Sequence, residues 1–274
     1  MPGPTVYPEL NVVLEELVSS VRAVLGDNFC GAYLQGSFAV GDADEYSDVD
    51  FIIAIEDELT DEQLTHLQAM HKRLYALESP WAQHLEGSYM PKEALRHVDP
   101  ERSAYWYLDN GSSQLEQDNH CNSAVVRWSL RERGVVLDGP DPKSLVEPVS
   151  SDQLRAEAFA GIDEFHAWAH DPQDRFKDAQ GRGPDMSRWK QPYLVLTFCR
   201  LLHTLDAGVV ASKREAGEWA LAALDPDWAS LIQQALDDSP DPWARVYQPA
   251  EPEVAARTLE FGDYASSVGG AGRP

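Results

Sequence analysis

The feature that most constrains this chain of 274 residues is a Gly-Ser turn placed eleven residues ahead of an Asp-x-Asp pair. Gly36 and Ser37 follow a short apolar segment, and Asp48 and Asp50 open a second one. Side chains alternate between the two faces of a strand, so both aspartates face the same side while Val49 between them faces a core. The pattern therefore predicts two carboxylates that share one site beside a tight turn.

These residue types suit a site for a metal ion and a phosphate group. Two neighbouring carboxylates repel each other unless a cation lies between them, and carboxylate oxygens are ligands that Mg²⁺ prefers. Gly36 permits a tight turn whose backbone N–H groups, together with the Ser37 hydroxyl, can face an anion. The alternative is a β-hairpin in which Gly36, Gly41 and Ser47 only form turns and the acids are solvated.

Several segments of the chain resemble one enzyme family. Gly36-Ser37, Gly41 and Ser47-Asp48-Val49-Asp50 resemble the signature of the DNA polymerase β-like nucleotidyltransferase superfamily. Further segments are similar to the interdomain region and the C-terminal helices of the streptomycin/spectinomycin adenylyltransferases: 131–140, 145–149, 195–200, Gly208, Lys213 and 218–220. The resemblance implies an O-adenylyltransferase that uses ATP and Mg²⁺ to modify a hydroxyl of a small cationic compound, such as an aminoglycoside or aminocyclitol antibiotic.

Glu86 is the third acid that the resemblance implies, as the catalytic base or as a metal ligand beside Asp48 and Asp50. Independently of the family, accepting a proton from an attacking hydroxyl needs a carboxylate or an imidazole within hydrogen-bond reach. Apolar residues flank Glu86 and predict a strand next to the one that carries the aspartates, where a partly desolvated Glu suits the role. His84 is the alternative base, and an exposed strand residue is the alternative interpretation of Glu86.

The resemblance assigns the ATP phosphates to residues in both halves of the chain. Gly36, Ser37 and Ser47 would hold them through backbone and hydroxyl donors, and Arg200 and Lys213 would offset the charge of the triphosphate. The alternatives are a solvent-facing helix residue for Arg200 and a helix-cap residue for Lys213.

The expected substrate residues depart from the family in part. Trp106 lies roughly where the family has a tryptophan that contacts the drug, and a sugar ring or a cation could stack on it; the alternative is a core residue. An ungapped match places Met186 and Lys190 where the family has drug-binding acids, and Asp185 comes into register only with a shift of the loop. A lysine repels a cationic aminoglycoside, which argues against streptomycin. Asp171, Asp174 and Asp178 in the same loop are the candidates to replace the drug-binding acids of the family. Two other aromatic residues, His120 and Trp128, are expected to lie in the core.

Composition limits the partners. The net charge is -24, from 46 acidic and 22 basic residues. Binding a polyanion needs clustered Lys and Arg, so we expect no nucleic-acid partner, whereas a polycationic drug would be attracted; the alternative is that the charge only serves solubility.

Three cysteines at unrelated spacings predict buried thiols in a reducing compartment. With no leader pattern and no run of about 18 apolar residues, we expect a cytoplasmic monomer with no membrane partner.

Periodicity and the resemblance together predict an α+β fold. We expect a nucleotidyltransferase domain over 1–149, with helices on a mixed sheet, a helical bundle over 150–268, and a disordered tail over 269–274. The helices are expected over 10–25, from Thr60, over 122–133, over 191–206, and from the Ser212 capping box to about Leu224. The segment 134–149 is expected to be a linker, and 169–188 a loop.

Two other function classes stay open. A nucleotidyltransferase of this superfamily could modify a protein or an RNA end, although the acidic charge and the long helical domain count against that function. A non-catalytic nucleotide-binding module is the other class, and the presence of all three acids counts against it.

Overall fold

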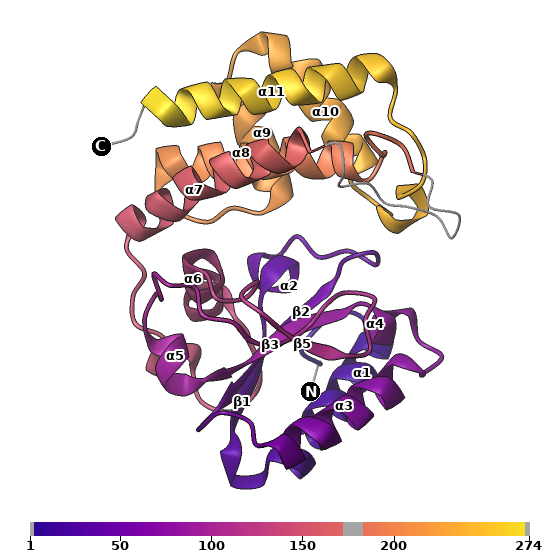
Figure 1. The fold of residues 1–274 in the computed structure, drawn as a ribbon, viewed down its shortest axis with the longest axis vertical. Helices are drawn as coiled ribbons and strands as arrows, with labels where there is room; N and C mark the ends of the chain where they lie inside the picture. The colour runs from indigo at the N-terminus through magenta and orange to yellow at the C-terminus, as the bar shows by residue number, and fades with distance from the viewer. Residues whose placement is uncertain (1–2, 172–182, 272–274) are drawn as a thin grey trace. The chain divides into compact units, whose positions relative to one another are not determined.

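The computed structural model describes residues 3–171 and 183–271, and the chain divides into two compact units, Met1–Val149 and Ser150–Pro274. The first unit combines a sheet with helices, and the second is helical (Figure 1). The expected α+β class is confirmed.

The first unit is built, within its described residues, on a six-stranded mixed sheet in the order β5-β4-β3-β2-β1-β6. β2 and β3 run parallel, and the other neighbouring pairs are antiparallel. The strands are β1 Phe29–Leu34, β2 Val49–Ile55, β3 Leu85–Pro91, β4 Tyr105–Leu108, β5 Leu115–Asp118 and β6 Val135–Asp138. The strand with Glu86 therefore lies directly beside the strand with Asp50, as expected.

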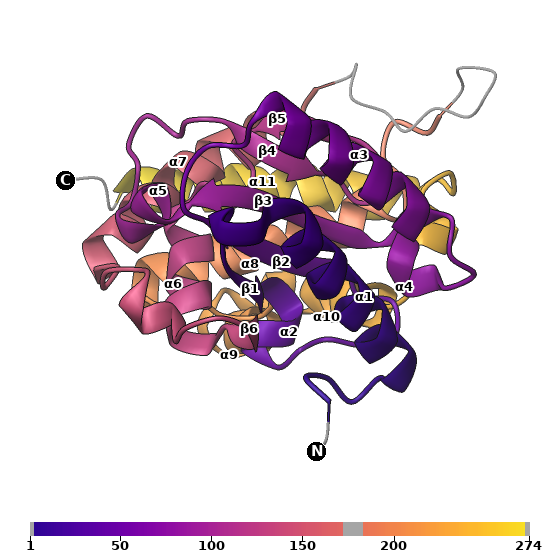
Figure 2. The same ribbon diagram turned by 90° about the horizontal axis from the view of Figure 1, so that it is seen from below.

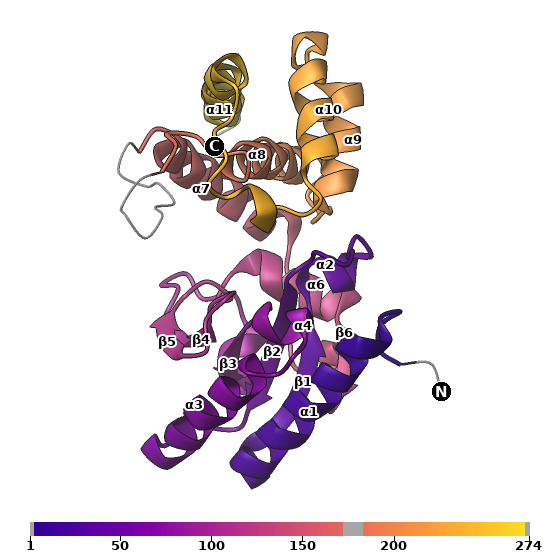
Figure 3. The same ribbon diagram turned by 90° about the vertical axis from the view of Figure 1, so that its right-hand side faces the viewer.

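Helices cover both faces of this sheet. They are α1 Pro8–Leu25, α2 Gly36–Val40, α3 Asp61–Tyr75, α4 Pro80–Gln83, α5 Lys92–Arg96 and α6 Ala124–Arg133, with short 3-10 turns η1 Gly26–Asn28 and η2 Pro142–Ser144. The apolar stripes of α1 and α3 pack on one face against Phe51 and Ile53 (Figures 2 and 3). Leu95 of α5 and Leu130 of α6 pack on the other face.

β2 is buried on both faces beyond its first residues. The side chains from Phe51 to Ala54 are completely buried, as is typical of a strand covered from both sides. Since the buried part of β2 is fixed by this packing, the polar residues at the start of the strand are held in place at one end of the sheet.

One expected linker segment contains a strand. Residues Val135–Asp138 form β6, an edge strand that pairs with β1, whereas we expected 134–149 to be a linker. Four residues between Gly134 and Gly139 are too few for alternation to be recognised, because neighbouring turn formers dominate so short a window.

The second unit is a bundle of helices around α8. Its elements are α7 Ser151–Ala169, α8 Lys190–Ala207, α9 Lys213–Ala223, α10 Ala229–Asp238 and α11 Pro252–Ala271, with 3-10 turns η3 Pro226–Trp228 and η4 Trp243–Arg245. α8 contacts α7, α9, α10 and α11, and it buries Leu194, Phe198 and Leu202. The capping box of Ser212 and Glu215 begins α9, as expected.

The expected tail is partly helical. α11 continues to Ala271, so residues 269–271 belong to a helix, and 272–274 lie outside the described residues. Gly269 packs against Ile162 of α7, which explains how a Gly-rich end can remain in the bundle. Cys121 and Cys199 are buried as expected, whereas Cys30 is half-buried. Among the described residues, no helix is long and apolar enough to cross a membrane.

Candidate functional site

The three expected acids lie where the neighbouring strands β2 and β3 begin. Asp50 is aligned with Glu86 across the parallel pair, and Asp48 lies two residues before Asp50. Val49 and Phe51 are completely buried, so by alternation both aspartates face the opposite side of the sheet. Because paired strands lie about 4.8 Å apart, Asp50 and Glu86 start from neighbouring backbone positions, with Asp48 two residues before Asp50.

The expected Gly-Ser turn is the first turn of helix α2, and it packs directly on this site. The Gln35 N–H donates to the carbonyl of Asp50 at 2.9 Å, which fixes the turn against β2. Gly36 has a φ of 58°, and a Cβ there would lie 1.9 Å from Asp50 Oδ2, so only glycine fits. The Ser37 hydroxyl is buried and has no hydrogen-bond partner among the described residues. A buried hydroxyl of this kind is a group that a bound ligand can satisfy.

Glu86 is held by two donors. The Tyr107 hydroxyl donates to Glu86 Oε1 at 2.7 Å, and His120 Nε2 lies 3.0 Å from the same oxygen. The Tyr107 and His120 rings stack with centroids 5.2 Å apart. Burial, reinforced by Glu86, raises the pKa of Tyr107, so its hydroxyl stays protonated and acts as a donor. The hydrogen bond with Glu86, assisted by the charge of Asp50, raises the pKa of His120.

His120 is therefore part of the site, and the expectation that it lies in the core is wrong. Its side chain is 57% exposed, and its ring stacks on Tyr107 and contacts Glu86 instead of packing in the apolar core. Trp128, the other residue expected in the core, is half-buried on α6.

Asp48 has its own supporting network. The Asn110 amide donates to Asp48 Oδ1, and His84 Nδ1 lies 3.0 Å from Asn110 Oδ1. His84, the alternative base, is therefore linked to Asp48 through the side chain of Asn110. Tyr107 and Asn110 were not predicted from the sequence, because neither stands in a motif. In the structure they lie close to the acids because β4 ends beside the start of β3.

Two other expected residues have different surroundings. The Ser47 hydroxyl accepts from the Asp44 N–H at 2.9 Å and donates to its carboxylate at 3.1 Å, so it shapes the turn before Asp48. Trp106 packs against the core under α1 and α3, whereas its neighbour Tyr107 faces the acids. The structure does not bring Trp106 together with the acids.

The expected phosphate-binding cations belong to the second unit. Arg200 is half-buried on α8, and Lys213 opens α9 with its ammonium 5.1 Å from the centroid of the Tyr193 ring. Tyr193 and Arg200 are two helical turns apart, so they share one face of α8. The two cations therefore lie along the same face of this bundle.

Lys190 and Met186 are buried in the second unit. The Lys190 ammonium donates to the Trp168 carbonyl at 3.0 Å and lies 4.2 Å from the centroid of the Trp168 ring. Its charge is engaged at the carboxyl end of α7, so the expected repulsion of a cationic drug is weaker than the charge alone suggests. The acids Asp171 and Asp185 are exposed, and Asp174 and Asp178 lie outside the described residues.

Two family models match the chain. Residues 144–256 match the C-terminal domain of aminoglycoside adenylyltransferase, and residues 29–99 match a nucleotidyltransferase domain. The second match covers the turn, both aspartates and Glu86.

Curated relatives extend over most of the chain. A spectinomycin 9-adenylyltransferase of Staphylococcus aureus is 23% identical over 250 residues, which cover 83% of this chain and 85% of the relative. An aminoglycoside (3'') (9) adenylyltransferase of Shigella flexneri is 22% identical over 284 residues, which cover 97% and 95%.

The fold is also similar to that of a solved structure, the spectinomycin adenyltransferase AAD(9) from Enterococcus faecialis with ATP and spectinomycin. The TM-score is 0.67, with 93% of this chain and 98% of the other covered. At 15% identity, this likeness shows a shared fold.

Proposed function

Because this chain belongs to the aminoglycoside adenylyltransferase family, we propose that it transfers AMP from ATP, with Mg²⁺, to a hydroxyl of an aminoglycoside or aminocyclitol. The observation that carries the proposal is the alignment of Asp50 with Glu86 on parallel strands, beside Asp48 and the Gly36 turn.

The acids fit a hard divalent cation. Asp48, Asp50 and Glu86 offer only carboxylate oxygens, which is the donor set that suits Mg²⁺. Asp48 and Asp50 would hold the ion, with Glu86 as a further ligand or as the base. The ion, when bound, would stabilise charge on the attacking and leaving oxygens.

The residues of the chain would bind and orient the reactants. The backbone of the turn and the buried Ser37 hydroxyl would hold a phosphate. A substrate hydroxyl oxygen would bond to the α-phosphorus, and the bond from that phosphorus to the departing oxygen would break, releasing pyrophosphate. Glu86, oriented by Tyr107 and His120, would accept the hydroxyl proton.

The resemblance assigns further binding residues to the second unit. Arg200 and Lys213 would offset the charge of the triphosphate. The substrate would meet an acidic protein of net charge -24, in which Asp185 is an exposed acid close to the start of α8. Both features favour a cationic acceptor.

A panel of acceptors tests this proposal. The full chain, ATP and Mg²⁺ are incubated with spectinomycin, streptomycin and further aminoglycosides, and products are analysed by mass spectrometry together with pyrophosphate release. We expect an acceptor-dependent mass increase of one AMP. Transfer of labelled AMP only to a protein or RNA, or ATP binding without turnover on any acceptor, would contradict the proposal.

A further inference from the structure

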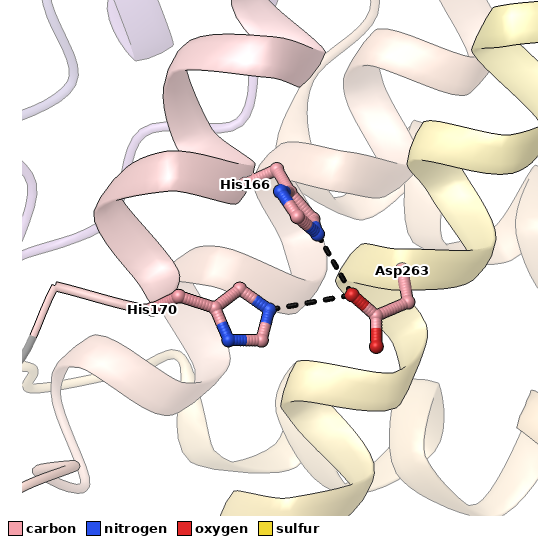
Figure 4. Close-up of side chains that lie close together, drawn as sticks. All are labelled: His166, His170 and Asp263. Carbon is pink, nitrogen blue, oxygen red and sulfur yellow. Dashed lines mark hydrogen bonds and ion pairs between the residues drawn. The ribbon is translucent and has the colours of Figure 1, made fainter.

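The helical unit holds a second group of metal-binding side chains that the adenylyl transfer does not use. His166 and His170 lie four residues apart at the carboxyl end of α7, so their rings project from one face of the helix. Asp263 of α11 points at both rings (Figure 4). Two histidines at this spacing on a helix are a common arrangement for binding zinc.

The three side chains converge on one point. His166 Nε2 lies 2.7 Å and His170 Nε2 lies 3.3 Å from the same oxygen, Asp263 Oδ1 (Figure 4). All three ligand atoms lie within 4.8 Å of one another. In a tetrahedral site with bonds of about 2.0–2.2 Å, neighbouring ligand atoms are roughly 3.4 Å apart. Small side-chain rotations would therefore bring the group to the spacing that an ion needs.

The donor set indicates the class of ion. Imidazole nitrogens favour Zn²⁺ and neighbouring transition metals, whereas Mg²⁺ prefers a set made only of oxygens. The side chains are 32%, 40% and 62% exposed for His166, His170 and Asp263, so water can reach the remaining coordination position. The carboxyl end of α7 adds a negative helix dipole, which favours a cation there.

We propose that His166, His170 and Asp263 bind a divalent transition-metal ion of the zinc class, completed by water. The ion would join α7, which begins the helical unit, to α11, which ends it. Its role would be to hold the last helix on the bundle, in addition to the apolar contacts between these two helices.

Zinc binding to the full chain, made without a histidine tag and stripped of metal, tests the proposal. Zn²⁺ is titrated against a chromophoric chelator, and Co²⁺ is used to record the visible spectrum. We expect one site in this unit with the absorption of four-coordinate Co²⁺, and a higher unfolding temperature with Zn²⁺. His170→Gln and Asp263→Asn should each weaken Zn²⁺ binding by at least about tenfold, since a side chain that touches the ion matters at least as much as the partners that hydrogen-bond to such ligands.

Two control variants make the outcome specific. His66→Gln removes an exposed histidine on α3 and should leave Zn²⁺ binding unchanged. Asp50→Asn alters the acids of the first unit and should also retain this site, which separates the result from the proposed adenylyl transfer. Zn²⁺ affinity and thermal shift that are the same in His170→Gln, Asp263→Asn and the unchanged protein would overturn the proposal, because the three side chains would then form only hydrogen bonds.

Discussion

Replacing Gly36 with alanine tests whether the turn positions the carboxylate of Asp50. Gly36 has a φ of 58°, and an added Cβ would lie 1.9 Å from Asp50 Oδ2, 2.5 Å from its Cγ and 2.9 Å from its Cβ. Ordinary contact begins at 3.4 Å, so the oxygen must move by about 1.5 Å. The Asp50 backbone is fixed in β2, so the displacement falls on its carboxylate.

The expected effects on stability and activity differ in size. A left-handed backbone costs an alanine about 1–2 kcal/mol, which lowers the unfolding temperature of a chain of this size by a few degrees. A misplacement of about 1 Å at a reacting centre costs about a hundredfold in rate. We therefore expect Gly36→Ala to reduce kcat/KM by at least about a hundredfold while the protein remains folded.

Gly41→Ala is the matched control. Gly41 also has a positive φ, 82°, but apart from its immediate chain neighbours no atom of the described residues lies within 4 Å of the position of an added Cβ. It should lose similar stability and keep most of its activity. The assay is acceptor-dependent pyrophosphate release, with thermal unfolding of each variant. If Gly36→Ala were as active as Gly41→Ala, the contact between residue 36 and the Asp50 carboxylate would have no effect on activity. That result would refute the predicted role of Gly36 in positioning Asp50.

Three further predictions concern supporting residues. Tyr107→Phe removes one of the two donors to Glu86, and a hydrogen bond to a charged group is worth about 1.5–3 kcal/mol. We expect kcat/KM to fall by at least about tenfold and the unfolding temperature to fall by a few degrees. Steady-state rates check this, and an unchanged rate would exclude the role. Burial lowers the pKa of His71 to about 3, so below pH 6.5 only the unfolded chain gains a proton at this residue. The free energy of unfolding should therefore fall by about 1.4 kcal/mol per pH unit down to about pH 3. Urea unfolding at pH 7 and pH 5 should show a smaller decrease in the free energy of unfolding for His71→Leu than for the unchanged protein. Lys190→Met removes the charged donor to the Trp168 carbonyl, which keeps the Asp171 N–H at 3.3 Å, and it also removes the contact of the ammonium with the Trp168 ring. It should reduce stability by about 1–3 kcal/mol, as measured by thermal unfolding, whereas an unchanged midpoint would show that these contacts contribute nothing.

The sequence predicts the elements whose signals are local. The apolar stripe of α1, the start of α3 at Thr60, the capping box of α9, and the alternation around Asp48 and Asp50 are each encoded in a short stretch of chain. Together with the family resemblance, these signals predicted the α+β class and the pairing of the strand with Asp50 and the strand with Glu86.

What the sequence did not predict depends on contacts between distant segments. His120 reaches Glu86 across 34 positions of the chain, and Asn110 reaches Asp48 across 62. Neither residue has a local pattern that distinguishes it from a loop residue. Lys190 shows the same limit in the second unit, because its burial depends on the Trp168 ring and carbonyl, 22 residues earlier.

AMP transfer by Asp50→Asn tests most directly whether Asp48, Asp50 and Glu86 form the catalytic site. This change keeps the size of the side chain and leaves the backbone hydrogen bond from Gln35 to residue 50 in place. We predict that the transfer rate falls by at least about a hundredfold, the scale for removing one preorganised electrostatic group, while circular dichroism and unfolding temperature stay close to those of the unchanged protein. A folded Asp50→Asn variant that transfers AMP within about threefold of the original rate would contradict the claim that these carboxylates form the catalytic site.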